Sequence, residues 1–291
     1  MEITIFTPTY NRAYTLLRLY NSLKAQTNKN FIWLIVDDGS TDNSKELIEN
    51  WINHKFIEIV YYKQKNQGKS MAHNKGVNLT RTELFTCVDS DDYLEERAVE
   101  YILNKWNSQK SSKLTGILAY KGLPENKTLT SMDNVAIKSS TLNLAYSRYG
   151  LKGDTMLIFR KDILSKYKFP QFSDEKFVPE AYLYDLVDQE GELLFLREVL
   201  YYCEYLEDGY TNNMAKLLAD NPKGYLAYIK QRLIFDRTIK SKITNTIRYI
   251  GMCICAGEKK YIQNSVYPKI TFILMPVGYI FFYKKYKNIN T

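Results

Sequence analysis

Residues 31–42, Phe-Ile-Trp-Leu-Ile-Val-Asp-Asp-Gly-Ser-Thr-Asp, run from an apolar stretch straight into a polar turn. The same junction occurs after three other apolar stretches, Ile3–Thr7, Ile57–Tyr62 and Leu84–Val88. The segments between these stretches carry apolar residues at helical spacing, at Tyr14–Ala25, Ser44–Ile52 and Lys69–Val77. This alternation predicts a doubly wound α/β sheet of mainly parallel strands. Further strands are expected at Met156–Arg160 and Leu193–Tyr202.

Each of the first four strands ends in a cluster of polar residues. The clusters are Thr7-Pro8-Thr9-Tyr10-Asn11-Arg12, Asp37-Asp38-Gly39-Ser40, Asn66-Gln67-Gly68-Lys69 and Asp89-Ser90-Asp91-Asp92. Open α/β sheets bind their ligands beyond the carboxyl ends of the strands. Because all four clusters are expected at that edge, we predict that it forms the binding site.

The last cluster places the carboxylates of Asp89, Asp91 and Asp92 close together, where their negative charges repel. A hard divalent ion such as Mn²⁺ or Mg²⁺ relieves this repulsion, since it takes carboxylate oxygens and completes its coordination with water and phosphate. An acidic turn that caps a helix starting near Tyr93 explains the same residues. The residues alone leave both interpretations open.

The second and third clusters suit a nucleotide. Asp37 or Asp38 can accept a hydrogen bond from a base or a ribose hydroxyl, and the alternative is a simple turn with Asp42 or Asn43 as helix cap. Gly68 and Lys69 offer backbone N–H groups and a cation at a helix start, which suits a diphosphate. An ordinary helix start has the same composition, so neither cluster identifies a ligand by itself.

Taken in order, the four clusters resemble those of family 2 glycosyltransferases. The matching segments are Thr-Pro-Thr-Tyr-Asn-Arg, Val-Asp-Asp-Gly-Ser-Thr-Asp, Asn-Gln-Gly-Lys and Val-Asp-Ser-Asp-Asp. The resemblance is strong from residue 3 to about residue 95 and looser to about residue 212. It implies a GT-A fold, a Rossmann-like α/β three-layer sandwich with a mainly parallel sheet, over residues 1–212. The nucleotide-binding half would be residues 1–95 and the acceptor half residues 96–212, followed by a basic helical C-terminal extension at 213–291.

The resemblance also assigns roles to the matching positions. Pro8, Tyr10 and Arg12 would line the nucleotide pocket, while Asp37 or Asp38 would read the uracil or the ribose. Lys69 would lie near the diphosphate and Asp89 near the ribose, and Asp91 with Asp92 would hold the metal. Gly68, Asn74 and Ser90 complete the implied donor-binding residues.

An inverting transfer needs a general base for the acceptor hydroxyl, in this family usually an Asp of an acidic pair. The corresponding segment is Pro179-Glu180-Ala181, so the resemblance points to Glu180. Because the acidic pair is missing, Asp154 and Asp185 remain competitors, and Glu180 is equally explained as a helix-start residue. Residues 205–212, around Gly209, correspond to a loop that closes over the donor phosphates, or they are a plain exit loop.

The resemblance implies transfer of a sugar from a nucleotide sugar, expected to be a UDP-sugar, to a hydroxyl of a glycan or lipid-linked acceptor. We expect inversion at the sugar and a role in cell-surface polysaccharide synthesis. The alternative enzyme is a sugar nucleotidyltransferase, which would carry a Gly-rich basic loop directly after the first strand. The alternative without chemistry is a sugar-nucleotide-binding scaffold, suggested by the lone Glu180.

Positive charge is concentrated near the C-terminus. The net charge is +8, and residues 209–291 hold 14 basic residues against 3 acidic ones. Ile270–Tyr283 is mostly apolar and is flanked by Lys269, Lys284, Lys285 and Lys287. This pattern is typical of an interfacial anchor on an anionic membrane, although a terminal helix packed on the catalytic domain is the alternative.

The remaining features concern the compartment. The chain starts with a strand pattern in place of a signal peptide, and no apolar run reaches the ~18 to 20 residues that span a bilayer. The four cysteines are too scattered for a disulfide framework. We therefore expect a cytoplasmic protein, peripheral on the inner face of the cell membrane. Nucleic acid is not an expected partner, and a homo-oligomeric state stays open.

Overall fold

The computed structural model describes residues 1–124, 127–203, 214–236 and 238–287. The chain divides into two compact units, the first made of Met1–Lys168 with Asp185–Leu206 and the second of Phe169–Tyr184 with Glu207–Thr291. Each unit has a hydrophobic core of its own. The predicted loop at residues 205–212, and with it the predicted boundary near 212, lies outside the described residues.

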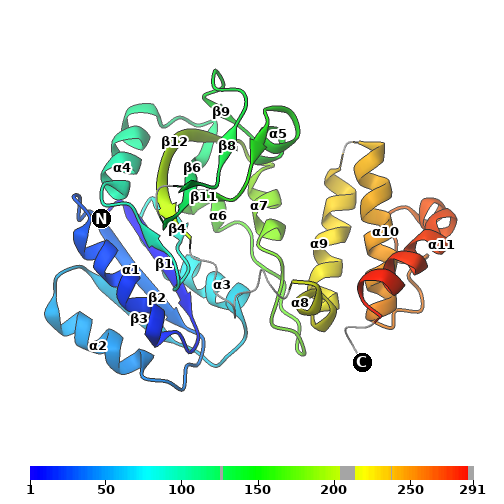
Figure 1. The fold of residues 1–291 in the computed structure, drawn as a ribbon, viewed down its shortest axis with the longest axis horizontal. Coiled ribbons are helices and arrows are strands. Elements are labelled where there is room, and N and C mark those ends of the chain that lie inside the picture. Colours follow the sequence, from blue (N-terminus) through cyan, green and yellow to red (C-terminus); the bar gives the residue numbers. More distant parts are fainter. Residues whose placement is uncertain (125–126, 204–213, 237, 288–291) are drawn as a thin grey trace. The chain divides into compact units, whose positions relative to one another are not determined.

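The first unit is built on one mixed sheet (Figure 1). Across the sheet the strands are β3 (Ile59–Lys63), β2 (Phe31–Asp37), β1 (Ile3–Thr9), β4 (Leu84–Cys87), β11 (Thr155–Arg160), β6 (Leu114–Leu123), β12 (Glu192–Tyr202) and β5 (Tyr93–Leu94). Strands β1 to β4 run parallel, as predicted, whereas β11 is antiparallel to both β4 and β6. Short strands β7 (Lys127–Thr128) and β9 (Ser139–Ser140) pair with β6 and β12, and β8 (Ser131–Met132) pairs with β10 (Leu151–Lys152). The carboxyl ends of β1 to β4 therefore meet at one edge, where all four polar clusters lie.

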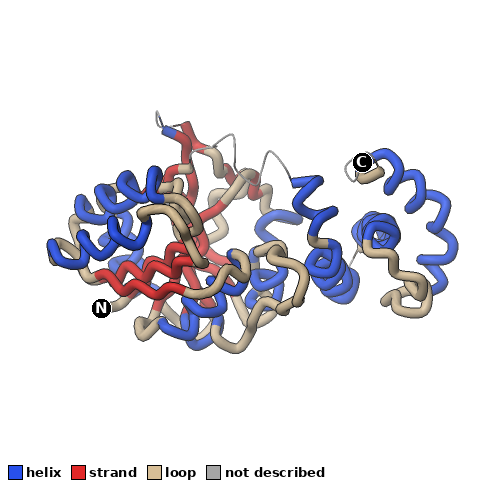
Figure 2. The backbone as a smooth tube through the Cα atoms, turned by 90° about the horizontal axis from the view of Figure 1, so that it is seen from below, coloured by secondary structure: helices blue, strands red, loops and turns tan. Residues whose placement is uncertain are grey.

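Helices cover both faces of this sheet (Figure 2). The helices α1 (Ala13–Ala25), α2 (Ser44–His54) and α4 (Ala98–Gln109) share one core with the inward side chains of β1 and β2, among them Ile5. The helix α3 (Lys69–Leu79) lies on the other face, where His73 meets the ring of Phe6 edge-on at 5.6 Å. Ile5 and Phe6 are neighbours on a strand, so their side chains point to opposite faces. Two short helices, α5 (Leu142–Arg148) and α6 (Lys161–Leu164), complete the unit. The layering is that of the predicted GT-A sandwich.

The second unit is helical. It contains α8 (Met214–Asp220), α9 (Pro222–Phe235), α10 (Ile239–Cys255) and α11 (Pro268–Lys285), while α7 (Ala181–Val187) starts in this unit and ends in the first. The Glu175 carboxylate accepts hydrogen bonds of 2.8 Å from the N–H groups of Lys223 and Gly224, in the first turn of α9. This contact explains why a segment from the middle of the chain folds with the C-terminal helices. Among the described residues, no helix combines the length and apolar character needed to cross a membrane.

Candidate functional site

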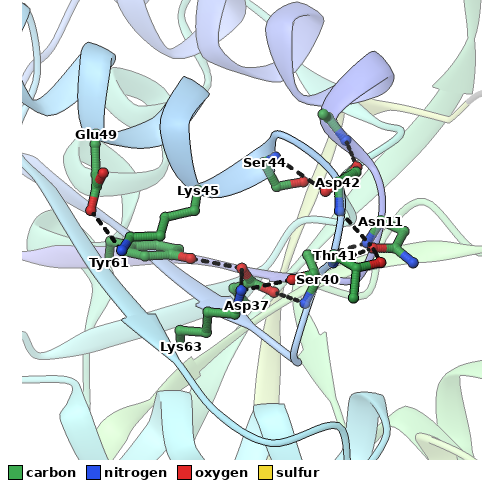
Figure 3. A network of polar contacts seen from close by, with 11 residues as sticks. Asn11, Asp37, Ser40, Thr41, Asp42, Ser44, Lys45, Glu49, Tyr61 and Lys63 are labelled. Atoms are coloured by element: carbon green, nitrogen blue, oxygen red, sulfur yellow. Dashed lines mark hydrogen bonds and ion pairs between the residues drawn. The ribbon is translucent and has the colours of Figure 1, made fainter.

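The loops after β1 and β2 are joined by hydrogen bonds (Figure 3). Asn11 adopts a left-handed conformation with φ of 52°, which Asn tolerates better than most residues. Its N–H donates to Ser40 Oγ at 2.9 Å, and its Oδ1 accepts a hydrogen bond from the Thr41 N–H at 2.8 Å. The turn after β1 is therefore fixed to the turn after β2.

Three predicted nucleotide-pocket residues lie at the end of β1 and in the turn that follows it. Pro8 is buried within β1, opposite Val36 of β2. Tyr10 is 47% exposed at the edge of the sheet, so its ring is free to meet a ligand. Arg12 is half-buried, and its guanidinium donates to the Tyr14 hydroxyl. The structure thus brings an exposed aromatic ring and a cation to the predicted edge.

Asp37 is fully buried at the end of β2. Its Oδ1 accepts a hydrogen bond of 2.7 Å from the Ser40 N–H, and its Oδ2 accepts one of 2.7 Å from the Tyr61 hydroxyl (Figure 3). Lys63 Nζ lies 4.0 Å from the same Oδ2. Burial, together with the bond to Asp37, raises the pKa of Tyr61 well above its ordinary value. Asp37 therefore closes the turn and joins β2 to the edge strand β3.

Asp38 is also buried, but its carboxylate faces the third cluster. Oδ1 accepts hydrogen bonds from Gln64 Nε2 at 2.8 Å and from the Gln67 N–H at 2.9 Å. Oδ2 accepts one from the Gly68 N–H at 2.7 Å. Gly68 has φ of 90°, a conformation that favours glycine, and it is the residue before α3. Asp38 thereby fixes the loop that presents the start of α3.

The carboxylate of Asp42 accepts hydrogen bonds from the first residues of two helices, α2 and α1 (Figure 3). Its Oδ1 accepts a hydrogen bond from the Ser44 N–H at 3.1 Å and its Oδ2 one from the Ala13 N–H at 3.1 Å. Burial alone would raise the pKa of Asp42, but the hydrogen bonds from Ser44 and Ala13 outweigh it, so the pKa is lowered. The residue at the N-cap of α2 is Asn43, whose side chain makes no capping hydrogen bond. The Asp42 carboxylate instead accepts from the first N–H group of α2 and from the first N–H group of α1.

Lys69 and Asp89 connect the third and fourth clusters. Lys69 is the first residue of α3, and its Nζ lies 2.7 Å from Asp89 Oδ1. Asn74 is half-buried on the same helix, and Ser90 is buried in the turn after β4. The cation predicted to face a diphosphate therefore lies beside the acidic turn predicted to hold a metal.

Residues 89–92 form a tight turn, which we call the acidic turn. The Asp92 N–H donates to the Asp89 carbonyl at 3.1 Å, and Arg18 donates to the Asp91 carbonyl. Tyr201 of β12 accepts from the Asp89 N–H at 3.1 Å and donates to Asp92 Oδ2 at 2.6 Å. Burial and then the charge of Asp89 raise the pKa of Asp92 to about 7.

The acidic turn fits a divalent cation held together with phosphate. Burial and then the charge of Asp89 raise the pKa of Asp91, and nearby Arg12 and Lys69 offset this only in part. A cation would stabilise the charged form of such a carboxylate. Mg²⁺ is commonly held by one or two carboxylates plus substrate phosphates. In the described ranges no three His, Cys, Asp or Glu side chains are grouped as a metal site.

The three candidate bases lie in different places. Asp154 is exposed before β11, and its charge and those of Asp92 and Asp89 all act on the buried Cys203 thiol, whose pKa rises to about 12, mainly through burial. Asp185, on α7, accepts a hydrogen bond of 3.1 Å at its carbonyl from Gln189 Nε2.

Glu180 belongs to the second unit, whereas Asp154 and Asp185 belong to the first. It is half-buried and directly precedes α7, and its Oε2 accepts a hydrogen bond of 3.4 Å from the Tyr184 hydroxyl.

Sequence reasoning missed the residues that support these clusters. Tyr61 and Lys63 of β3 contact Asp37, while Tyr201 and Arg18 contact the acidic turn. These contacts join residues far apart in the chain. The chain has 25 tyrosines, and nothing in one sequence separates Tyr201 from the others.

The comparisons with known proteins agree with this geometry. The family model described as glycosyl transferase family 2 matches residues 4–168. The Staphylococcus aureus poly(ribitol-phosphate) beta-N-acetylglucosaminyltransferase TarP is 31% identical over 181 residues, covering 59% of this chain and 53% of TarP. The matched stretches span 15%, 38% and 53% of three curated bacterial glycosyltransferases, the third of which is TarP.

Solved structures share the architecture. The crystal structure of S. aureus TarS 1-349 in complex with UDP-GlcNAc has a TM-score of 0.63 at 17% identity, covering 99% of this chain and 90% of that one. The Pyrobaculum calidifontis mannosyltransferase PcManGT, in complex with GDP-Man and Mn²⁺, has a TM-score of 0.58 at 14% identity, covering 99% of this chain and 82% of that one. At these identities the likeness concerns the fold.

Proposed function

Since the chain belongs to glycosyl transferase family 2, we propose that it transfers a sugar from a nucleotide sugar to a hydroxyl group of a glycan or lipid-linked acceptor. The observation that carries the proposal is the meeting of the four polar clusters at one edge of the sheet, with Lys69 beside the acidic turn. The donor is a UDP-sugar and the pathway is cell-surface polysaccharide synthesis. TarP, named for transfer of N-acetylglucosamine, and the UDP-GlcNAc complex of TarS support this choice.

The donor nucleotide occupies the edge formed by β1, β2 and α3. Pro8, Tyr10 and Arg12 line its pocket, since Tyr10 offers an exposed ring for stacking and Arg12 a charge for the diphosphate. Asp37 or Asp38 reads the base or ribose. Both carboxylates already accept protein hydrogen bonds, so their orientation is set before the donor arrives.

The start of α3 and the acidic turn receive the rest of the donor. Lys69 faces the diphosphate, with Gly68 and Asn74 on the same loop and helix, while Asp89 and Ser90 approach the ribose. Asp91 would hold a Mn²⁺ or Mg²⁺ ion, with Asp92 beside it. Such an ion neutralises charge on the leaving diphosphate when bound.

The transfer inverts the anomeric carbon. The acceptor oxygen forms a bond to the anomeric carbon while the bond between this carbon and the diphosphate oxygen breaks. The nucleoside diphosphate leaves with the electron pair of that bond. A carboxylate takes the proton of the acceptor hydroxyl, and Glu180 has this role, with Asp154 and Asp185 as the competing residues. The family resemblance of its segment supports Glu180. Asp154 is supported by its charge, which raises the pKa of the Cys203 thiol as the charges of Asp92 and Asp89 do.

The experiment is a panel of UDP-, GDP- and dTDP-sugars, scored for binding by calorimetry in Mn²⁺ and in EDTA. We expect one UDP-sugar to bind more tightly in Mn²⁺, and Asp91→Ala to remove that gain. Asp133→Ala, an exposed carboxylate paired with Lys152, is the matched control. Equal affinity in Mn²⁺, in EDTA and in Asp91→Ala would contradict the metal assignment. Donor binding without turnover in any acceptor extract would favour a binding scaffold over an enzyme.

The C-terminal region binds an anionic membrane surface and places the enzyme on the inner face of the cell membrane. Helix α11 buries Thr271 and Gly278, while Phe272, Ile273 and Ile280 are 66%, 71% and 57% exposed. The helix therefore packs on its own unit by one side and offers apolar side chains on another. Lys269, Lys284, Lys285 and Lys287 flank it, and each basic residue near an anionic surface contributes about 1 kcal/mol.

A further inference from the structure

Tyr201 contacts both ends of the acidic turn. Its hydroxyl accepts a hydrogen bond from the Asp89 N–H at 3.1 Å and donates one to Asp92 Oδ2 at 2.6 Å. A tyrosine hydroxyl has one donor and can accept as well, so one oxygen atom satisfies two groups of the turn. The Asp92 N–H also donates to the Asp89 carbonyl at 3.1 Å, which closes the turn on itself. The shape of the turn therefore depends on one side chain from another strand.

The backbone holds Tyr201 firmly at this place. Tyr201 is 1% exposed and pairs with Leu94 of β5, the strand that begins directly after the acidic turn. The Glu95 N–H donates to the Leu200 carbonyl at 3.0 Å, which extends the same pairing. The ammonium of Lys121 lies 4.0 Å from the centre of the Tyr201 ring. The hydroxyl thus has little freedom to leave the turn.

The turn contains carboxylates of different exposure. Asp92, held by Tyr201, is 7% exposed, whereas Asp91 between it and Asp89 is half-buried. Asp89 is paired with Lys69 at 2.7 Å. Fixing Asp89 by its N–H and Asp92 by its carboxylate leaves the backbone of Asp91 little room to move, because it lies between two anchored residues. Arg18 adds a third anchor at the Asp91 carbonyl.

We propose that Tyr201 is a positioning residue of the donor site, whose hydroxyl holds the acidic turn so that Asp91 is presented to the divalent cation and the donor diphosphate. The inference rests on the proposed function, because it assigns a role within the same site. Tyr201 acts through Asp89 and Asp92, and it need not touch the donor itself. Removal of its hydroxyl should therefore weaken the metal-dependent part of donor binding.

The test is calorimetric titration of UDP, in Mn²⁺ and in EDTA, on the full chain and on Tyr201→Phe. We expect Tyr201→Phe to bind UDP about tenfold more weakly in Mn²⁺ and nearly as the unmodified protein does in EDTA, since a hydrogen bond to a charged group is lost. Tyr101→Phe is the matched control, because the Tyr101 hydroxyl is hydrogen-bonded to Glu198 of β12, which is not a residue of the acidic turn. Tyr101→Phe should bind UDP with unchanged affinity in Mn²⁺ and in EDTA.

A double-mutant cycle identifies the contact. In the Asp92→Asn background, Tyr201→Phe should cost clearly less than in the unmodified protein, since the two residues act as a pair. If Tyr201→Phe fails to fold, Asp92→Asn alone must still weaken UDP binding in Mn²⁺ more than in EDTA. Unchanged affinity of a folded Tyr201→Phe, or an equal loss in Mn²⁺ and EDTA, would overturn the role of Tyr201 alone. An unmodified protein that binds UDP equally in both buffers would overturn the metal-dependent donor site, and the role of Tyr201 with it.

Discussion

Asp37 and Asp38 are adjacent and buried, yet they hold different segments. Asp37 contacts Ser40 and Tyr61, so it closes the turn after β2. Asp38 contacts the N–H groups of Gln67 and Gly68, so it holds the loop before α3. Neither carboxylate can be replaced without changing the loops that would surround a nucleotide. If a variant of Asp37 or Asp38 loses donor binding, its free energy of unfolding must therefore be measured as well.

We predict that Asp38→Ala lowers the free energy of unfolding by about 2 to 4 kcal/mol, because buried N–H groups lose a charged acceptor. Denaturant unfolding followed by circular dichroism measures it. Asp133→Ala serves as the control, since it removes only an exposed ion pair with Lys152 and should cost less than about 1 kcal/mol. Equal losses in the two variants would show that the Asp38 contacts stabilise the fold no more than the exposed ion pair does.

At Glu180 the prediction concerns turnover. Glu180→Gln keeps the shape of the side chain and removes its basicity, so turnover should fall by ~10²- to 10⁴-fold. Donor affinity should hardly change, because a base serves the acceptor hydroxyl. A steady-state assay with the donor selected by the panel measures turnover, and calorimetric titration of UDP measures donor affinity.

Asp154→Asn and Asp185→Asn are the internal comparison for Glu180, each checked first for folding. If one of them abolishes turnover while Glu180→Gln stays near the unmodified rate, the role passes to that residue. Nuclear magnetic resonance of the new glycosidic bond adds a second criterion, since a retained anomeric configuration would remove the need for a base in this role.

At the scale of elements, the strands of the parallel half were predictable because each is a short apolar run followed by a polar turn. The central strand β6, Leu114–Leu123, was missed. It contains Gly116, where a Cβ would meet the Ile158 carbonyl at 2.0 Å, so this glycine permits close approach of β11. Such an apolar run with glycines shows no alternation, and periodicity alone does not distinguish it from a helix.

The candidate site also has a part that the sequence predicts and a part that it does not. Its loops could be predicted because their motifs are contiguous in the sequence and follow strands. Their supports could not, because Tyr61, Tyr201 and Arg18 reach the clusters only through the fold. The placement of residues 169–184 with the C-terminal helices also depends on distant contacts, such as Glu175 with Lys223.

For helix α11 we predict that the double variant Ile273→Asp, Ile280→Asp loses most of its binding to vesicles of phosphatidylglycerol and phosphatidylcholine. Both side chains are exposed, so the fold should survive while apolar contact with lipid is lost. Cosedimentation with vesicles measures binding. Val135→Asp, an equally exposed apolar residue of the first unit, is the control and should bind as before. Unimpaired binding of the α11 variant would mean that this helix does not enter the lipid surface.

At the scale of the whole molecule, the positive charge is distributed unevenly between the two units. The net charge is +8, yet residues 209–291 alone carry 14 basic and 3 acidic residues, so the preceding 208 residues are net negative. The sheet unit contains the four clusters of the candidate site, and the helical unit contains most of the positive excess. An anionic membrane should therefore attract the chain through its second unit.

We predict that binding to the same anionic vesicles falls steeply as salt rises from 0.1 M to 1 M, because the Debye length shrinks from about 10 Å to about 3 Å. Neutral phosphatidylcholine vesicles should bind weakly at both concentrations, since only the apolar contacts of α11 remain. Lys284→Gln, Lys285→Gln and Lys287→Gln combined should reproduce the effect of salt at 0.1 M, whereas Lys45→Gln, an exposed lysine of α2, should not. Binding that is indifferent to lipid charge and to salt would leave the apolar face of α11 as the sole attachment.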